Sequence, residues 1–420
     1  MASPGSPEMD WSTASPAAPG ALEGLRVIDM AAVVMGPYAA QILGDLGADV
    51  VKVEPPGGDM TRHSRPQRNA GMGALALNVN RNKRSLALNL KSSEGHRAML
   101  ELIRGADVLI TNNRPGALRR LGLDHDSVAG TNPRLVYCSA QGFRSDSDRA
   151  DLAAYDEIVQ SASGLTDLMR RATGQPTYVP TILADKVCSL TIAYSVLAAV
   201  VHQRSTGRGQ HIEVPMADAL LAFNLVEHLA GQTFEPPEGQ TGFPRSLSPG
   251  HGAMPTADGW VCIIPYTPRN IHDFFTAIGR TDVAEDPRFA DAASMAEHHA
   301  DLYAFVEEVS PTRTTAEWAR VCAEHSIPFA PVIGLDEVPH DDYVTSGGMV
   351  TVAEHPTEGA YRVVANPLRF SDTPATLRSH PPALGQHSAE VLGELGYDAE
   401  EISALARDGV TVGDRAGVAE

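Results

Sequence analysis

Residues 25–59 read LRVIDMAAVVMGPYAAQILGDLGADVVKVEPPGGD, and this stretch decides the fold. The apolar run at 25–30 predicts a strand, and residues 49–54 predict a second one. Between them, an alanine-rich segment that opens at Pro37 and ends near Gly47 predicts a helix. Strand, helix and strand fit within about 30 residues, which is the size of a βαβ unit with parallel strands.

The same alternation continues along the chain. Residues 92–104 have the apolar spacing of a helix, and 107–111 and 135–139 are typical of buried strands. The apolar run at 190–202 is too long for a strand and predicts a buried helix, which is followed by a strand candidate at 212–215. The predicted fold class is therefore α/β, with a doubly wound large lobe.

A change of composition marks a boundary in the second half of the chain. Residues 236–252 are rich in Gly, Pro and Ser, and beyond them 260–265 predicts a strand of a smaller α+β lobe. The predicted organisation is a disordered leader at 1–20, a large domain at 21–225, a small domain with its linkers at 226–335, and a return to the large domain at 336–420.

Charge and cysteine content exclude several classes of function. A formal net charge of -19 argues against nucleic-acid or anionic-membrane partners, so a polyanionic ligand would need a local basic patch. The four cysteines are far apart and form no CxxC, which favours neither disulfides nor zinc and suggests a cytoplasmic protein. No uninterrupted apolar run approaches the ~18 to 20 residues of a membrane helix.

Five segments together are similar to those of one enzyme family. They run in family order along nearly the whole chain: LGDLGADVVKVEPPGGD (43–59), NRNKRSLALNLKSSEG (80–95), NRPGALRRLGL (113–123), NPRLVYCSAQGF (132–143) and LGQHSAEVLGELG (384–396). On these motifs the chain resembles the class III CoA-transferases, a family that includes formyl-CoA and carnitine CoA-transferases and α-methylacyl-CoA racemase.

The resemblance carries expectations about architecture and ligands. It implies an intertwined homodimer in which a Rossmann-like large domain is built from both ends of the chain and a small α+β domain lies between them in sequence. It also implies an acyl-CoA and a small carboxylic acid as substrates, with no tightly bound cofactor and no metal.

Candidate contacts to the nucleotide end of CoA follow from the matched motifs. By resemblance they are Leu88, Lys91, Asn112, Asn113 and Arg120. Each lies at or just beyond the end of a predicted strand or in the adjoining loop, where open sheets bind their ligands. Arg120 is the best candidate for a phosphate contact, because a guanidinium matches phosphate geometry.

The reaction itself is less clear from the motifs. Transferases of this family use an aspartate that attacks the acyl-CoA thioester and forms a mixed anhydride. In an ungapped match from Ser163 to Asp185, Thr173 stands at that aspartate's position. A threonine cannot form a stable anhydride, so another group has to act if the chain is a transferase.

Three other residues are candidates for the catalytic chemistry, and a fourth is a candidate proton shuttle. The racemases of the family pair a histidine with a later aspartate, and here Tyr155 replaces the histidine while Asp185 matches the aspartate. Asp156 follows Tyr155 and is a further candidate, although it could instead pin a loop, and Asp185 could instead cap the helix that follows it. His251, in a glycine-rich loop at 248–252, is a candidate proton shuttle.

Three functions therefore remain open on sequence alone. The first is a CoA transferase in which Asp185 or Asp156 substitutes for the missing nucleophile. The second is an acyl-CoA racemase, epimerase or isomerase in which Asp185 and Tyr155 flank the α-carbon. The third is a non-catalytic acyl-CoA binding protein.

Overall fold

The computed structural model describes residues 19–412, so the expected leader at 1–20 lies almost wholly outside the described residues. The described chain divides into two compact units. The first contains residues 19–165, 178–223 and 343–412, and the second contains 166–177 and 224–342. Residues 166–177, which lie within the predicted large domain, group with the second unit.

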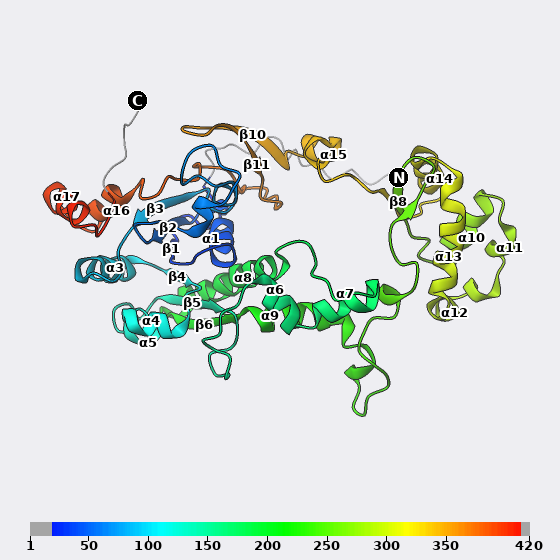
Figure 1. The fold of residues 1–420 in the computed structure, drawn as a ribbon, viewed down its shortest axis with the longest axis horizontal. Helices are drawn as coiled ribbons and strands as arrows, with labels where there is room; N and C mark the ends of the chain where they lie inside the picture. Colours follow the sequence, from blue (N-terminus) through cyan, green and yellow to red (C-terminus); the bar gives the residue numbers. More distant parts are fainter. Residues whose placement is uncertain (1–18, 413–420) are drawn as a thin grey trace, which may run out of the picture. The chain divides into compact units, whose positions relative to one another are not determined.

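The first unit is built mainly of alternating strands and helices (Figure 1). Its strands are β1 (Arg26–Asp29), β2 (Asp49–Glu54), β3 (Lys83–Ala87), β4 (Val108–Thr111), β5 (Val136–Gln141), β6 (Gln210–Pro215), β10 (Val350–His355) and β11 (Gly359–Val364). Its helices are α1 (Met35–Asp45), α2 (Ala74–Val79), α3 (Ser93–Gly105), α4 (Pro115–Leu121), α5 (His125–Val128), α6 (Asp156–Ala162), α8 (Leu183–Thr206), α16 (Ser388–Glu394) and α17 (Ala399–Arg407).

The central sheet has six strands in the order β3-β2-β1-β4-β5-β6, and all five neighbouring pairs are parallel. This is the strand order of a doubly wound sheet, whose direction of winding changes between β1 and β4. The prediction of an α/β fold with a parallel sheet is therefore confirmed.

Helices cover both faces of this sheet, as its apolar strands require. One face packs against α3, α4, α5, α16 and α17 through a core that includes Ile28, Met99, Leu109, Tyr137 and Leu392. Helices α1 and α8 pack together on the sheet, with α8 against β5 and β6 (Figure 1).

Helix α8 is longer than the sequence predicted. It runs for 24 residues from Leu183, so it begins seven residues before the predicted start at 190. By length and composition alone it could cross a membrane, with a mean hydropathy of 1.5, which corrects our expectation that no segment qualifies. It packs on α1, α6, β5 and β6, and 44% of its apolar window is buried inside the structure.

The carboxyl-terminal part of the first unit returns to the edge strand β3. The Ala87 N–H donates to Ser388 Oγ at 3.1 Å, and the Thr411 hydroxyl donates to the Ala87 carbonyl at 2.7 Å. The Asn89 N–H donates to the Val410 carbonyl at 2.7 Å. Residues about three hundred positions apart thus complete one core.

The second unit is a smaller α+β body. Its strands β7 (Met254–Pro255), β8 (Trp260–Ile263) and β9 (Phe329–Pro331) form an antiparallel sheet. Its helices are α10 (Pro268–Ala277), α11 (Thr281–Ala284), α12 (Ala292–Glu297), α13 (His299–Val309) and α14 (Thr315–Glu324), with α7 (Leu165–Thr173), α9 (Met216–His228) and α15 (Asp342–Ser346) at its boundaries. Trp318, Phe274 and Phe275 lie at the centre of its core.

Candidate active site

The loops that follow β1 and β4 lie side by side at the point where the sheet changes direction. Open α/β sheets bind ligands in the crevice outside this point. Asn112 joins the two loops, because its Oδ1 accepts from the Ala32 N–H at 2.8 Å and its Nδ2 donates to the Ala32 carbonyl at 2.7 Å. The Asn112 side chain is therefore a clamp on the main chain of the β1–α1 loop.

The next residue in this loop, Val33, has a strained backbone. Its φ of 67° is left-handed, a conformation that costs a β-branched residue about 1 to 3 kcal/mol. The Val33 N–H donates to Asp59 Oδ2 at 2.9 Å, and Lys52 Nζ lies 3.5 Å from the same oxygen. Nothing in the sequence marks this turn, since its strain depends on partners brought from β2 and β4.

A cavity of about 240 Å³, which we call the Asp185 cavity, adjoins the strained turn. Its walls come from the loops after β1, β4 and β5, from the start of α6 and from α8. The lining residues are Ala32, Val33, Met35, Asn112, Asn113, Arg114, Gln141, Gly142, Ala150, Leu152, Ala153, Ala154, Tyr155, Asp185 and Met216. Two of the three predicted catalytic residues, Tyr155 and Asp185, are thus brought together here.

Asp185 carries the unusual ionisable group of this cavity. Burial raises the pKa of its carboxyl to about 6 from 3.8, and the neighbouring carboxylates of Asp156 and Glu157 act in the same direction. A hydrogen bond from the Met35 N–H, at the start of α1, partly opposes this shift in pKa. At neutral pH the group is a poorly solvated carboxylate, suited to act as a nucleophile or a base.

Asp156, the third predicted catalytic residue, is buried outside the cavity lining. Its side chain is 4% exposed, and its Oδ1 accepts from the Ala184 N–H at 2.7 Å. The alternative that Asp185 caps α8 is excluded, because α8 begins at Leu183 and Asp185 lies inside its first turn. The carboxylate that caps this helix is Asp156.

Tyr155 directly precedes α6 and is 58% exposed. It lines the Asp185 cavity, so its phenol stands where a ligand in the cavity could accept a hydrogen bond. Asp185 is the more buried of the two groups.

Two further cavities lie next to the Asp185 cavity in the direction of α3 and α4, and the three together form a row. The middle cavity, of about 420 Å³, shares Ala32 and Asn113 with the Asp185 cavity and is also lined by Leu88 and Lys91. The outer cavity, of about 840 Å³, shares Lys91 with the middle one and is lined by Arg120. Four of the predicted CoA contacts therefore line the two cavities beyond Asp185, and Asn112 lines the Asp185 cavity.

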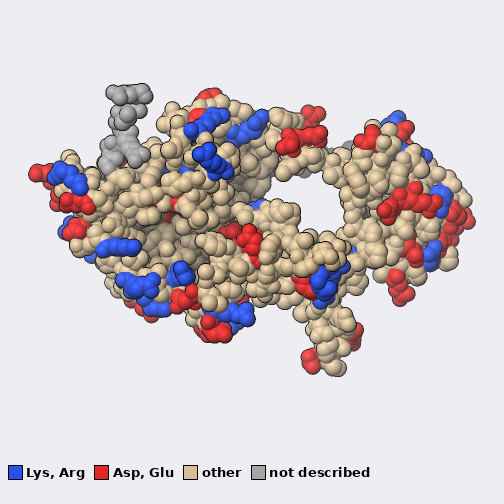
Figure 2. All heavy atoms as spheres, viewed as in Figure 1, with Lys and Arg blue, Asp and Glu red and all other residues tan. Residues whose placement is uncertain are grey.

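The outer cavity is rich in positive charge. Lys91, Arg119 and Arg120 line it together with Ser92 and Ser93. Figure 2 shows Lys and Arg side chains over α4 and beside α3 on this face of the first unit. Although the chain is acidic overall, this end of the row has the local basic patch that a polyanion requires.

Thr173 and His251 belong to the second unit, and the side chain of each contacts other residues of that unit. The Thr173 hydroxyl lies 2.8 Å from the Met169 carbonyl and 3.0 Å from that of Gln175, so it closes the last turn of α7. The His251 ring packs against Tyr303 at 5.3 Å, and burial lowers its pKa.

Comparison with known proteins identifies the family. The family model described as CoA-transferase family III matches residues 22–388. The chain belongs to CoA-transferase family III. The formyl-CoA:oxalate CoA-transferases of Escherichia coli O157:H7 and Shigella dysenteriae serotype 1 (strain Sd197) are each 33% identical to it over 410 residues, covering 91% of this chain and 98% of theirs.

Solved structures of the family have the same fold. A CaiB/BaiF family protein from Brucella suis matches with a TM-score of 0.77 and 29% identity, over 90% of this chain and 100% of that one. The hypothetical protein Rv3272 from Mycobacterium tuberculosis matches with a TM-score of 0.77 and 28% identity, over 89% and 99%. The family predicted from the sequence motifs is therefore confirmed.

Membership of CoA-transferase family III gives the row of cavities a ligand class, because the enzymes of this family use CoA thioesters. All eight predicted site residues lie within the matched range of 22–388. Three residues that the sequence did not suggest also shape the site: Met35 through its N–H, Asp59 through the strained turn, and Gln160 beside Asp156.

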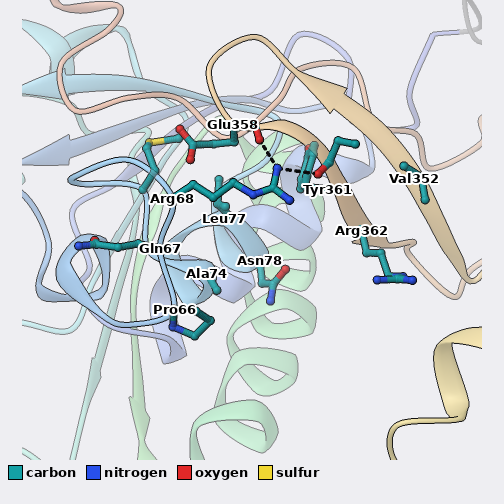
Figure 3. Close-up of a pocket in the computed structure, with 12 residues that line it drawn as sticks. Pro66, Gln67, Arg68, Ala74, Leu77, Asn78, Val352, Glu358, Tyr361 and Arg362 are labelled. Carbon is teal, nitrogen blue, oxygen red and sulfur yellow. Dashed lines mark hydrogen bonds between the residues drawn. The ribbon is translucent and has the colours of Figure 1, made fainter.

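A separate cavity of about 640 Å³ lies between residues 66–78, which include most of α2, and the β10–β11 hairpin (Figure 3). None of the predicted site residues lines it. Arg68 donates to the main-chain carbonyls of Glu358 and Ala360, the second at 2.8 Å (Figure 3). Because a two-stranded hairpin is marginally stable alone, these bonds are best explained as anchoring it to the first unit.

Proposed function

We propose that this protein is a CoA transferase that moves CoA between an acyl-CoA thioester and a carboxylic acid. The observation that carries the proposal is the row of three cavities, which leads from a basic end at Lys91 and Arg120 to one poorly solvated carboxylate at Asp185. This arrangement suits a long ligand with phosphates at one end and a reactive thioester at the other.

The nucleotide end of CoA would occupy the outer and middle cavities. Lys91 and Arg120 are exposed and would contact phosphates, while Leu88 would contribute apolar surface. Asn113 lies between the middle cavity and the Asp185 cavity, beside the expected path of the pantetheine arm. Asn112 would act through the loop it clamps, because both ends of its amide are bonded to Ala32.

In the proposed reaction, an oxygen of the Asp185 carboxylate attacks the thioester carbonyl carbon. The C–S bond breaks, CoA leaves as a thiolate, and the acyl group stays on Asp185 as a mixed anhydride. The thiolate then attacks the Asp185 carbonyl, which releases the first acid as a carboxylate and leaves Asp185 as a CoA thioester.

The acceptor acid completes the cycle by the reverse steps. Its carboxylate attacks the Asp185 thioester, and CoA again leaves as a thiolate. The thiolate attacks the acceptor carbonyl of the new anhydride, which forms the product thioester and regenerates the Asp185 carboxylate. The Met35 N–H would orient the carboxylate in its resting state, and the Tyr155 hydroxyl could donate to the thioester oxygen.

The test is chemical trapping of the acylated carboxylate. The protein is incubated with a panel of acyl-CoAs that begins with formyl-CoA, with oxalate among the acceptors, because both appear in the names of the relatives. After hydroxylamine or borohydride treatment, peptide mass spectrometry should find a modified Asp185. Asp185→Asn should abolish both the adduct and CoA exchange, whereas Asp126→Asn, at a carboxyl that is 95% exposed on α5, should retain both.

A second candidate function has its own supporting observation. Asp185 and Tyr155 line one cavity, where they could act as a base and an acid on either side of an α-carbon. An acyl-CoA racemase, epimerase or isomerase would incorporate solvent deuterium at the α-carbon without a free acid. Deuterium uptake without CoA exchange would favour this function over the transferase. Binding of acyl-CoA with neither reaction would indicate a non-catalytic binding protein.

We also propose that the protein acts as a homodimer in the cytoplasm. On α8, Leu190, Tyr194 and Val201 are 56%, 63% and 69% exposed, and their spacing puts them on one helix face. The four cysteines are free thiols, which suits a reducing compartment. Light scattering after gel filtration should give twice the chain mass, and Tyr194→Glu should reduce it to one.

A further inference from the structure

Asp156 is a carboxylate that the proposed reaction does not use. It is the first residue of α6 and is 4% exposed, yet no cationic side chain pairs with it among the ion pairs of the described residues. Its partners are instead the Ala184 N–H at 2.7 Å, the Asp185 N–H at 3.4 Å and Gln160 Nε2 at 2.6 Å. Two of these three donors belong to the first turn of α8.

Helix α8 lacks a capping side chain of its own. The residue at its N-cap position is Ile182, which has no side-chain oxygen, so the first N–H groups depend on a partner from elsewhere. Asp156 supplies that partner from 28 positions earlier in the chain. A carboxylate at this end is also favoured by the helix dipole.

Gln160 extends the same arrangement to the segment that leads into α8. Its side chain is fully buried, and its Oε1 accepts from the Val179 N–H at 2.9 Å. Its Nε2 donates to Asp156 Oδ2 and also lies 3.3 Å from the Val179 carbonyl. Asp156 and Gln160, one turn apart on α6, thus fix both the approach to α8 and its first turn.

We propose that Asp156 is a positioning residue, which caps α8 from α6 and so holds the Asp185 carboxyl in its cavity. The inference rests on the proposed role of Asp185 in catalysis. Asp156 does not line the cavity, and both of its oxygens already accept hydrogen bonds, so it is poorly placed to be the nucleophile.

The same contact has an electrostatic consequence for the reactive carboxyl. Asp156 and Glu157 are negative neighbours that favour the protonated form of Asp185, and the Met35 N–H favours the ionised form. The other ionisable side chains that line the cavity are Tyr155 and Arg114. The Asp156 charge therefore helps to raise the pKa of the Asp185 carboxyl above that of an ordinary aspartate.

The test separates the capping oxygen of Asp156 from its charge. Asp156→Asn keeps an oxygen for the Ala184 N–H but removes the negative charge, whereas Asp156→Ala removes both. Asp185 is followed by ¹³C NMR of carboxyl-labelled protein, a readout that does not require turnover. In Asp156→Asn the titration midpoint of Asp185 should fall by about one pH unit, and the acidic limb of the CoA-exchange rate should fall with it.

Asp156→Ala should unfold at a lower temperature and should lose more exchange activity than Asp156→Asn. Gln160→Ala serves as a second variant, because it loosens the segment before α8 and leaves the charge in place. It should lower the exchange rate severalfold while the Asp185 midpoint stays near 6.

Two results would overturn the assignment. One is an unchanged Asp185 midpoint in folded Asp156→Asn, and the other is recovery of the trapped acyl group on Asp156. The failure of the proposed function looks different: the Asp185 midpoint then falls in Asp156→Asn as expected, but the wild-type protein gives no trapped adduct and no CoA exchange.

Discussion

The two ends of the row of cavities differ in how they hold charge. In the outer cavity, Lys91 and Arg120 are exposed side chains on a loop and a short helix, open to water and salt. At the other end, the Asp185 carboxyl in its cavity and the buried Asp156 carboxyl beside that cavity are packed against helix ends and are bonded to main-chain N–H groups. The outer end can therefore bind a charged ligand that arrives from solvent, while the Asp185 end makes one ionised group reactive by limiting its solvation.

This contrast explains why the sequence was informative at one end and ambiguous at the other. Exposed cations on a loop act independently, so a motif match can name them one by one. The role of a carboxyl at the Asp185 end depends on which helix it caps and on which neighbour it faces. Asp156 and Asp185 have the same side chain, and only the fold separates their roles.

The largest expected effect that tests this comparison between the two ends is on the free energy of unfolding, in the variant Asp185→Asn. A buried carboxyl with a raised pKa destabilises the fold when it is ionised, since the native state binds the proton more tightly than the unfolded chain does. The penalty is absent below pH 3.8, develops as pH rises through about 6, and is complete above it. Asp185→Asn should therefore stabilise the protein by about 2 kcal/mol at pH 8 and by almost nothing at pH 4.

Urea unfolding at the two pH values measures this difference. Asp126→Asn on the exposed surface is the matched control and should change stability little at either pH. A stabilisation of Asp185→Asn that is the same at pH 4 and pH 8 would show that Asp185 is as well solvated as the groups of the outer cavity, and the comparison would break.

A smaller effect is expected at the clamp between the two loops. Asn112→Ala removes both bonds to Ala32, so the strained Val33 turn should relax and the wall of the Asp185 cavity should move. We expect kcat/KM for CoA exchange to fall by about tenfold, mainly through kcat, because the clamp does not contact the nucleotide end.

The control for the clamp is Asn78→Ala, an exposed asparagine on α2 outside the row of cavities. If Asn112→Ala raises KM tenfold and leaves kcat unchanged, Asn112 contacts CoA directly, as the motif match implied, and the clamp does not govern the reaction.

The smallest effect is expected at the outer cavity. Arg120→Ala should weaken CoA binding by about fivefold at low salt, since an exposed charge pair contributes about 0.2 to 1 kcal/mol. The loss should shrink as salt is raised toward 0.5 M, because screening already weakens the contact in the wild-type protein. Calorimetric titration with CoA at several salt concentrations measures both the loss of affinity and its dependence on salt. Arg104→Ala, at the far end of α3, is the matched control. A salt-independent loss above a hundredfold would mean that Arg120 is desolvated in the complex.

The elements of the large lobe were predictable because their apolar periods are clear. Residues 25–30, 49–54 and 107–111 became β1, β2 and β4, with ends shifted by at most one residue. Strand β3 was missed, since it opens with Lys83, and a charged residue argues against a buried strand. In the fold, Lys83 Nζ is buried and donates to Asp29, the Pro37 carbonyl and Asn80, partners that no local pattern reveals.

The sequence named residues of the candidate site but not the contacts between them. Tyr155 and Asp185 were named and do line one cavity, and Lys91 and Arg120 line another. The start of α8 was placed too late, because Ile182 gives no capping signal and the cap comes from another helix. Because of that error, the sequence did not show that Asp156 caps α8 while Asp185 lines the cavity.

The return of the chain end to β3 has a consequence for biosynthesis. The bond between Ala87 and Ser388 spans 301 positions, so the outer edge of β3, away from β2, is not covered until the last helices have been translated. At about 5 to 20 residues per second, the apolar face that α16 and α17 cover stays open for about 15 to 60 s on the ribosome. A nascent chain of this kind is expected to depend on chaperones for as long as its edge is uncovered, and its yield should respond to the rate of translation.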